Sequence, residues 1–172
     1  MRPPRTALVP ATEVFALRHA VLRPGRPAAS AAFAEDAAPG TFHVAAYDAD
    51  DTEGKAIRAC VTFLPEPLPG TGEDAYRFRG MASDPAVRGL GYGTAVLRAG
   101  LAEAAARGAG LVWCNGRTSA RGFYEHHGFT ARGEEFTVEG IGPHLVFTIK
   151  LSGGGPGDGS GGGAAGGVGT RP

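Results

Sequence analysis

The residues best suited to chemistry lie in a glycine-rich turn, Arg88-Gly89-Leu90-Gly91-Tyr92-Gly93-Thr94. A strand-like run precedes this turn and a helix-like run follows it. The first N–H groups of a helix have no intrahelical partner, and the helix dipole adds partial positive charge there. Glycine lets the backbone approach an anion closely and adopt a positive φ. The turn is therefore predicted to hold a diphosphate.

Two common diphosphate sites do not fit this turn. A dinucleotide fingerprint needs G-x-G-x-x-G near the chain start, with an acidic residue about 20 residues later. Here the glycines follow G-x-G-x-G, and several antiparallel-looking strands come first. A P-loop needs a Lys after its second glycine, whereas this turn has Arg88 and no Lys. We therefore expect a diphosphate ligand of another class.

Two blocks of the sequence together resemble the GCN5-related N-acetyltransferase (GNAT) family. Residues 87–93 (VRGLGYG) are similar to its R/Q-x-x-G-x-G/A signature, and residues 81–85 (MASDP) fit the strand end before it. Residues 115–129 (NGRTSARGFYEHHGF) are similar to its N-x-x-(x)-A-x-x-x-Y-E-x-x-G-F run. Residues 17–24 also look like the first helix of bacterial members. The order of the two blocks and the gap between them fit the family as well.

The resemblance implies that the diphosphate belongs to acetyl-CoA, the acyl donor. It implies an α/β (α+β) fold with a mixed, mostly antiparallel sheet of six to seven strands and about four helices. The pantetheine arm is expected beside the strand before the turn, where a backbone N–H near Met81 or Ala82 would bind the oxyanion. The implied cofactor-binding residues are Met81, Ala82, Ser83, Arg88, Gly89, Leu90, Gly91, Tyr92, Gly93, Thr94, Asn115 and Ser119.

The resemblance also implies a catalytic acid. Tyr124 matches the family's tyrosine, which would protonate the departing CoA thiolate. Phe123 is expected to pack the helix against the sheet instead, since neighbours on a helix point to different faces. Asn115 either holds a pantetheine amide or forms a turn. Ser119 either contacts the cofactor or caps a helix.

A base or a water chain must remove the proton from the acceptor amine, and no motif identifies the residue. His144 is the preferred candidate, because a Gly-Pro turn precedes it and a predicted acceptor-side strand follows it. An imidazole also titrates near neutral pH. The competing interpretation is an ordinary turn histidine. The other candidates are His43, Asp84, Glu134 and Glu135.

Periodicity and chain breakers predict the elements that must position these residues. Strands are expected over residues 6–9, 42–47, 55–64, 75–84, 111–114, 129–138 and 144–151. Helices are expected over residues 13–22, 94–107 and 119–127, with a short helical piece around 28–34. The strands that flank the helix after the turn are predicted to pair in parallel, and the earlier strands antiparallel. His126, His127 and the acidic turn after residue 47 are expected to be solvated.

Composition limits the class of protein. The 172 residues, 42% of them hydrophobic, suit one domain over residues 1–151 and a disordered Gly-rich tail over residues 152–172. The formal net charge of zero argues against a nucleic-acid binder. No apolar run reaches the roughly 20 residues of a membrane span, and the N-terminus has no signal-like apolar region. We expect a cytoplasmic protein without metal or membrane partner, with Cys60 and Cys114 as free buried thiols.

The leading hypothesis is an N-acetyltransferase that transfers acetyl directly from acetyl-CoA to an amine in a ternary complex. The acceptor would be a small molecule or a peptide, and the protein a monomer or homodimer. The alternative is a catalytically weak or inactive acyl-CoA sensor, which keeps the glycine turn but does not need Tyr124. A nucleotide-phosphate binder of another class is disfavoured by the glycine spacing.

Overall fold

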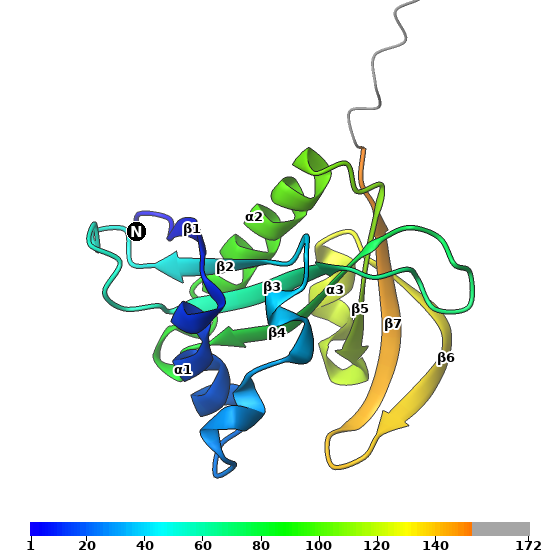
Figure 1. The fold of residues 1–172 in the computed structure, drawn as a ribbon, viewed down its shortest axis with the longest axis horizontal. Helices are drawn as coiled ribbons and strands as arrows, with labels where there is room; N and C mark the ends of the chain where they lie inside the picture. Colours follow the sequence, from blue (N-terminus) through cyan, green and yellow to red (C-terminus); the bar gives the residue numbers. More distant parts are fainter. Residues whose placement is uncertain (153–172) are drawn as a thin grey trace, which may run out of the picture.

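The computed structural model describes residues 1–152, so the predicted tail, apart from Ser152, lies outside the described residues. One sheet of seven strands runs in the order β1-β2-β3-β4-β5-β7-β6 (Figure 1). All neighbouring strands are antiparallel except β4 and β5, which confirms the predicted mixed sheet and its parallel pair. The strands are β1 (Arg5–Val9), β2 (Phe42–Tyr47), β3 (Ala59–Pro65), β4 (Tyr76–Ser83), β5 (Leu111–Arg117), β6 (Thr130–Val138) and β7 (Gly142–Lys150).

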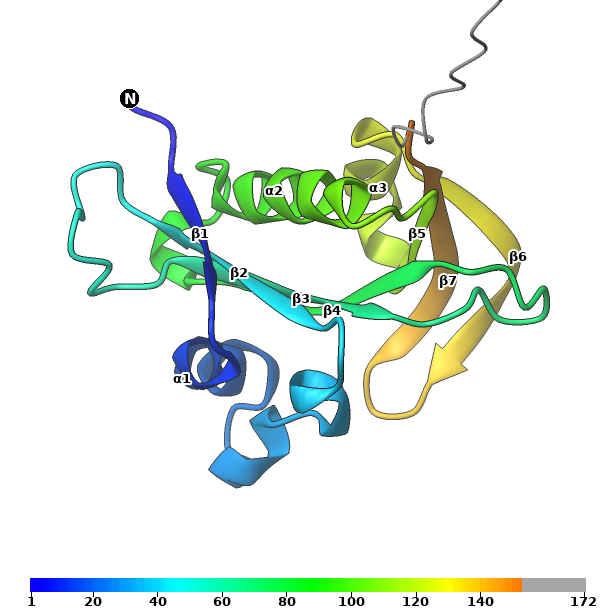
Figure 2. The same cartoon turned by 45° about the horizontal axis from the view of Figure 1, so that its top comes forward.

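Helices cover both faces of this sheet. Helices α2 (Tyr92–Ala106) and α3 (Arg121–His126) lie on one face, and α1 (Ala11–Leu22) lies on the other (Figure 2). The described residues contain three α-helices where about four were expected. The remaining helical pieces are single 3-10 turns: η1 (Ala28–Ala31), η2 (Ala34–Ala37), η3 (Pro85–Val87) and η4 (Thr118–Ala120).

The main core lies between the sheet and α2. Phe63 of β3 and Leu97 of α2 are both fully buried there. A Cβ added to Gly100 of α2 would lie 2.0 Å from the Phe63 ring, so only glycine lets the helix come this close. This contact fixes the height of α2 above β3 and β4, and therefore the place of its N-terminus.

Strand β3 begins at Ala59, four residues later than predicted. The Asp51 carboxylate accepts hydrogen bonds from the backbone N–H groups of Lys55 and Ala56, at 3.1 and 3.0 Å. Those two N–H groups are therefore bonded to the preceding turn, and β3 begins only after them. The other strand boundaries agree with the expected ones to within about three residues, the uncertainty usual for element ends.

Candidate active site

Strands β4 and β5 separate soon after they meet. Their parallel register contains only two pairs, Tyr76 with Val112 and Arg77 with Trp113. From Phe78 on β4 and from Cys114 on β5 the two strands no longer pair. Their backbone edges therefore face a gap, whose position between the two strands can be followed in Figure 1.

A bulge lies on the β4 side of this gap. Cys60 of β3 pairs with Ala82 and Thr62 pairs with Arg79, so β4 has one residue more than β3 in this interval. Gly80, with φ of +63°, provides the left-handed conformation that the bulge needs. The bulge turns part of the β4 backbone away from regular pairing at Gly80 and Met81. Met81, Ala82 and Ser83 then continue along the gap, as expected for the residues beside a pantetheine arm.

The glycine-rich turn forms the N-terminus of α2. The N–H groups of Tyr92, Gly93 and Thr94 make no hydrogen bond to another described residue, and no side chain caps the helix. Gly89 and Gly91 have φ of +78° and +89°, and added Cβ atoms there would meet nothing within 4 Å. Glycine is thus required by backbone conformation, and the space above the turn is open. These features suit an oxygen-rich anion such as a diphosphate.

Side chains from other elements hold the turn in place. The Tyr92 hydroxyl donates to the carboxylate of Asp48, the residue after β2, and this bond raises the pKa of Tyr92. Arg58 donates to Asp84 at 2.6 Å and lies 3.5 Å from Asp48. Asp84 also accepts the N–H of Ala86 at 2.9 Å and so caps η3. Asp48, expected to be merely solvated, and Asp84, considered as a base, both support the turn instead.

Tyr124 lies beside the gap, on the face of the sheet that α2 covers. Its ring stacks on Phe147 with a centroid distance of 4.5 Å and lies 6.2 Å from the ring of Phe78 on β4. A Cβ on Gly116 of β5 would lie 2.4 Å from the Tyr124 ring, so glycine makes room for it. Tyr124 is buried while Phe123 is half-buried, so the expectation that Phe123 alone packs this helix is wrong. Burial, and then the Cys114 thiol, raise the pKa of Tyr124.

The structure places His144 on the opposite face of the sheet from Tyr124. On β7 it alternates with Leu145, which packs in the same core as Tyr124. His144 is buried, its Nδ1 lies 2.8 Å from the Gly142 carbonyl oxygen, and Arg117 is its register partner on β5. If Nδ1 donates to that oxygen, Nε2 carries the lone pair that can accept a proton.

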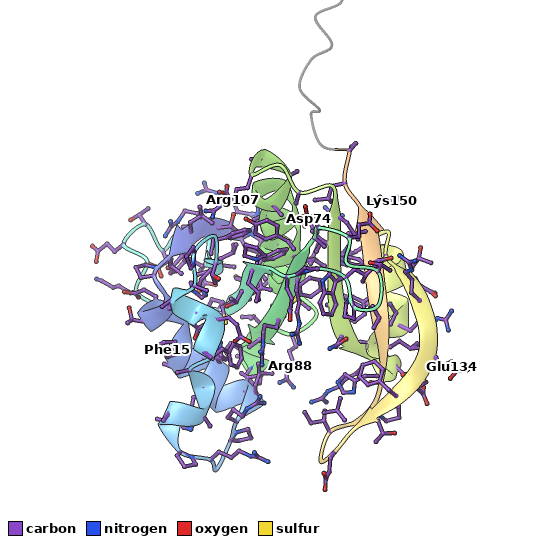
Figure 3. All side chains as sticks on the ribbon, turned by 45° about the vertical axis from the view of Figure 1, so that its right-hand side comes forward. Phe15, Asp74, Arg88, Arg107, Glu134 and Lys150 are labelled. Atoms are coloured by element: carbon purple, nitrogen blue, oxygen red, sulfur yellow. The ribbon has the colours of Figure 1, made fainter. Side chains whose placement is uncertain are left out.

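The positions of the other candidate bases suit proton removal from an acceptor less well than that of His144. His43 is buried between Thr62 and Asp36, with its Nδ1 2.8 Å from Thr62 Oγ1. Glu134 lies on the outer strand β6, far from Arg88 of the turn (Figure 3). The neighbouring Glu135 accepts a hydrogen bond from Thr118 at 2.8 Å.

A family model described as an acetyltransferase (GNAT) domain matches residues 38–131. The chain belongs to the GNAT family. The uncharacterized N-acetyltransferase YitI of Bacillus subtilis (strain 168) is 32% identical over 143 residues, which cover 81% of this chain and 93% of YitI.

Solved structures share the fold of this chain. An acyl-CoA N-acyltransferase from Pseudomonas aeruginosa has a TM-score of 0.65 at 18% identity, covering 84% of this chain and 98% of its own. A chain of the NatC complex, bound to Gag peptide and CoA, has a TM-score of 0.69 at 13% identity, covering 88% and 100%. At these identities the likeness shows the fold. The predicted family and fold class are confirmed, and the chain is a GNAT-type acyl-CoA-dependent N-acyltransferase.

Other predicted GNAT site residues are solvent-accessible. Arg88 follows η3 and has an exposed side chain, and Asn115 is exposed on β5 beside the gap. Ser119 is exposed in η4, and no side-chain cap bond is present at η4 or α3. The described residues thus give Ser119 no capping role.

His127, which the sequence marked as a surface residue, lies beside the GNAT turn. Its Nε2 is 3.2 Å from the hydroxyl of Thr94, and its ring packs 4.5 Å from that of Phe123. Burial is the main cause that lowers the pKa of His127. The sequence signal that could have indicated this position was the place of His127, three residues after Tyr124 at the C-terminus of α3.

Both cysteines are free and buried, as predicted. Burial raises the pKa of Cys60 to about 11 and that of Cys114 to about 12, which makes either thiol a poor nucleophile. Among residues 1–152 no group of His, Cys, Asp or Glu side chains is arranged to hold a metal ion. No helix in the same range is long and apolar enough to cross a bilayer.

Two cavities lie away from the gap. One, of about 380 Å³, is lined by residues that include Val9, His43 and Arg107. The other, of about 280 Å³, lies beside Glu66, Tyr76 and Gly108. Neither includes a residue of the glycine turn. The gap, with its unpaired strand edges and the uncapped N-terminus of α2 beside it, is therefore the candidate site.

Proposed function

We propose that this GNAT enzyme transfers an acetyl group from acetyl-CoA directly to an amine while both are bound. The observation that carries this proposal is the gap between β4 and β5, which begins after Arg77 and Trp113 and opens beside the uncapped N-terminus of α2. The gap would receive a strand-like pantetheine arm, and the helix N-terminus beside it would receive the diphosphate that follows this arm in the donor. The proposed catalytic domain spans residues 1–151.

The binding roles follow from the backbone. The N–H groups of Gly91, Tyr92, Gly93 and Thr94 would receive the diphosphate oxygens of the donor, with Arg88 adding positive charge. The β4 edge at Met81, Ala82 and Ser83 would pair with the amide-rich arm, as an added strand does. Asn115 would hold the arm from the β5 side.

The chemical roles separate by face of the sheet. On the acceptor face, His144 Nε2 would take the proton of the amine, whose nitrogen attacks the thioester carbonyl carbon. Backbone N–H groups of the bulge at Gly80 and Met81 would stabilise the oxyanion. On the cofactor face, Tyr124 would donate its proton to the sulfur as the carbon–sulfur bond breaks. The products are an N-acetylated amine and CoA with a free thiol.

A paired assay tests this proposal. Binding of acetyl-CoA is measured by calorimetry, and CoA release is measured with a panel of small amines, amino acids and peptides. We expect saturable binding and CoA release that depends on an added amine. Absence of both results would contradict the proposal, and binding without release by any amine would favour a sensor. Cytoplasmic location and the monomer or homodimer state remain predictions, tested by fractionation and light scattering.

A further inference from the structure

Arg79 presents its guanidinium on the acceptor face of the sheet, directly before Gly80 of the bulge. Its side chain is 28% exposed, and it makes no hydrogen bond to any described residue. Its nearest acid is Glu35, whose Oε2 lies 3.6 Å from Arg79 Nη1, beyond hydrogen-bond distance. A guanidinium has five N–H donors, so several remain open beside the proposed point of acetyl transfer.

Glu35 forms an ion pair with Arg79 itself, and two further acids are already paired with other arginines. Asp36 lies 2.8 Å from Arg18, and Glu66 accepts from Arg77 at 3.0 Å. Burial is the main cause that lowers the pKa of Arg79, and the nearby positive charges of Arg77, Arg18 and Arg23 act in the same direction, with only Glu35 opposing them. The region around Arg79 therefore has more positive charge than its carboxylates balance.

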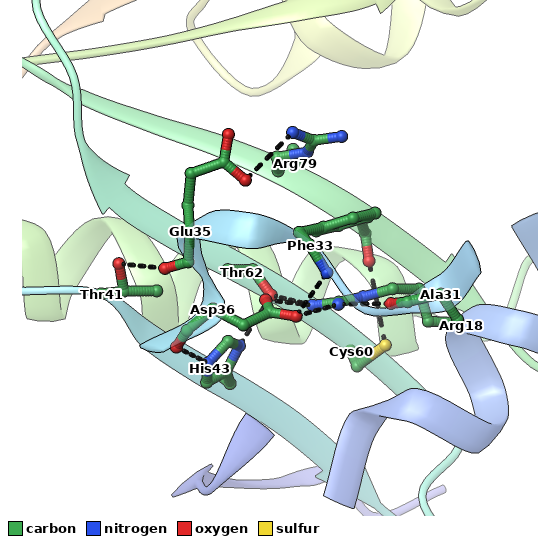
Figure 4. Close-up of polar contacts among 11 residues, drawn as sticks. Arg18, Ala31, Phe33, Glu35, Asp36, Thr41, His43, Cys60, Thr62 and Arg79 are labelled. Atoms are coloured by element: carbon green, nitrogen blue, oxygen red, sulfur yellow. Dashed lines mark hydrogen bonds and ion pairs between the residues drawn. The ribbon is translucent and has the colours of Figure 1, made fainter. Parts of the chain in front are cut away.

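A buried network fixes this arrangement (Figure 4). Arg18 is fully buried and donates to the Ala31 carbonyl, to Asp36 and to Thr62, at 2.8, 2.8 and 2.6 Å. It thereby joins α1 and the 3-10 turns to β3.

The same network positions Phe33 between two arginines. Phe33 lies with Arg18 on one side of its ring and Arg79 on the other, each 3.9 Å from the ring centroid (Figure 4). A Cβ on Gly80 would lie 2.8 Å from the Phe33 ring, so the ring packs directly on the bulge. Stacking on this ring holds the Arg79 guanidinium in one orientation before any ligand arrives.

We propose that the acceptor is an amine that also carries a carboxylate, and that Arg79 binds this carboxylate. The inference rests on the proposed function, because the bulge that follows Arg79 is where the amine would meet the thioester. A guanidinium pairs with a carboxylate through two parallel N–H···O bonds, which fixes both distance and direction. Arg79 would thus select the acceptor and orient its amine, without taking part in proton transfer.

The test compares acceptors that differ only in this group. CoA release is measured with the standard amino acids, β-alanine and short peptides, each beside its carboxamide. For the best carboxylate acceptor, Arg79→Gln is expected to lower kcat/KM about ten- to a hundredfold, the usual effect of losing a charge-assisted hydrogen bond. Most of the loss should appear in KM. The carboxamide should change less than about twofold, and Arg79→Lys should be intermediate. Comparing variants cancels the different basicity of the two amines.

Arg77→Gln is the matched control. It removes an arginine from the same strand and face, but one that is already paired with Glu66 and stacked 5.1 Å from the Trp113 ring. It should leave the preference for the carboxylate acceptor unchanged. Thermal unfolding and acetyl-CoA affinity are measured for every variant, and Arg79→Lys keeps the test valid if Arg79→Gln folds poorly.

Three results would overturn the inference. These are equal loss with both members of a pair in Arg79→Gln, a wild-type preference for carboxamides, and acetyl-CoA binding without release by any carboxylate-bearing amine. Failure to bind acetyl-CoA at all is a different result, which rejects the proposed function itself.

Discussion

The phenol of Tyr124 is buried in the core and also lies beside the gap. Its ring is part of the core, between Phe78 and Phe147, yet its position at the gap is suited to a departing thiolate. We expect Tyr124→Phe to lower kcat about a hundredfold or more, the usual effect of losing a general acid. Acetyl-CoA affinity should remain within about twofold, since the ring is kept. Steady-state kinetics and calorimetry check these values, and unchanged kcat would reject Tyr124 as the acid.

The pKa of Tyr124 also predicts a pH profile. Because burial raises this pKa above 10, the phenol stays protonated at every ordinary assay pH and can donate throughout. Tyr124 should therefore cause no loss of kcat as pH rises from 7 to 10. A fall of kcat in this range that disappears in Tyr124→Phe would contradict the prediction.

Gly116 decides whether the Tyr124 ring fits. In Gly116→Ala the new Cβ would meet the Tyr124 ring at 2.4 Å and the Phe147 ring at 2.8 Å. We expect the free energy of unfolding to fall by about 1–3 kcal/mol, as for other overpacked cores, and kcat to fall with it. Gly122→Ala on α3 is the control, because its Cβ would meet nothing within 4 Å. Denaturant unfolding that shows equal stability for the two variants would contradict this account.

At the scale of elements, glycines at the two ends of α2 allow the effect of backbone strain to be distinguished from the effect of lost ligand binding. Gly91 and Gly108 have nearly equal φ, +89° and +91°, and both have open space around a new Cβ. Alanine at either position should cost about 1–2 kcal/mol of unfolding free energy. Only Gly91→Ala should also weaken CoA binding, because only Gly91 belongs to the proposed cradle.

Pantetheine supplies the second comparison for this pair of glycines. It lacks the diphosphate, so Gly91→Ala should bind it as well as the wild-type protein does. Calorimetry with CoA and pantetheine checks both expectations. Equal loss of CoA affinity in Gly91→Ala and Gly108→Ala would show that strain, not the cradle, is responsible.

Elements with local signals were the most predictable from sequence. Sequence patterns predicted the glycine turn, helix α2 and the strands beside it. Helix termini and glycines with positive φ have characteristic residue patterns that span only a few residues. The parallel pairing of β4 and β5 then followed from strand–helix–strand order. The burial of Tyr124 rather than Phe123 was not predictable, since α3 has only six residues and its short pattern does not show which side faces the sheet.

At the scale of the whole molecule, contacts between distant segments were missed. Tyr92 meets Asp48 across 44 residues, and Arg18 meets Thr62 across 44 as well. Neither pair forms a motif, because each depends on strands and helices that only the folded chain brings together. The proposed acceptor face depends on contacts such as that of Arg18 with Thr62, which is why the sequence indicated an acyl-CoA donor and left the acceptor open.

The buried network predicts how stability depends on pH. His43 faces Thr62, Asp36 and Arg18, and desolvation by burial is the main cause that lowers its pKa below the ordinary 6.5. Below pH 6.5 the unfolded chain therefore takes up a proton that the folded chain refuses. Stability due to this group is complete above pH 6.5 and is lost as pH falls toward the lower folded pKa.

Urea unfolding between pH 7.5 and 5 tests this sign. The free energy of unfolding should fall with pH, and fall less in His43→Gln, which keeps a polar partner for Thr62. His126→Gln, at an exposed histidine, should follow the wild-type curve. A His43→Gln curve parallel to that of the wild type would remove His43 as a source of the pH dependence.

Burial of the only two cysteines, Cys60 and Cys114, has a practical consequence for the measurement of CoA release. Free thiols can be measured with a disulfide reagent that releases a coloured product. The reagent reacts with thiolates that solvent can reach. The cysteines of the native enzyme should therefore release almost no coloured product. Each molecule of product released should then correspond to one molecule of CoA. A slow rise toward two thiols per chain without acceptor would instead count unfolded enzyme, so a single trace reports both turnover and the integrity of the catalyst.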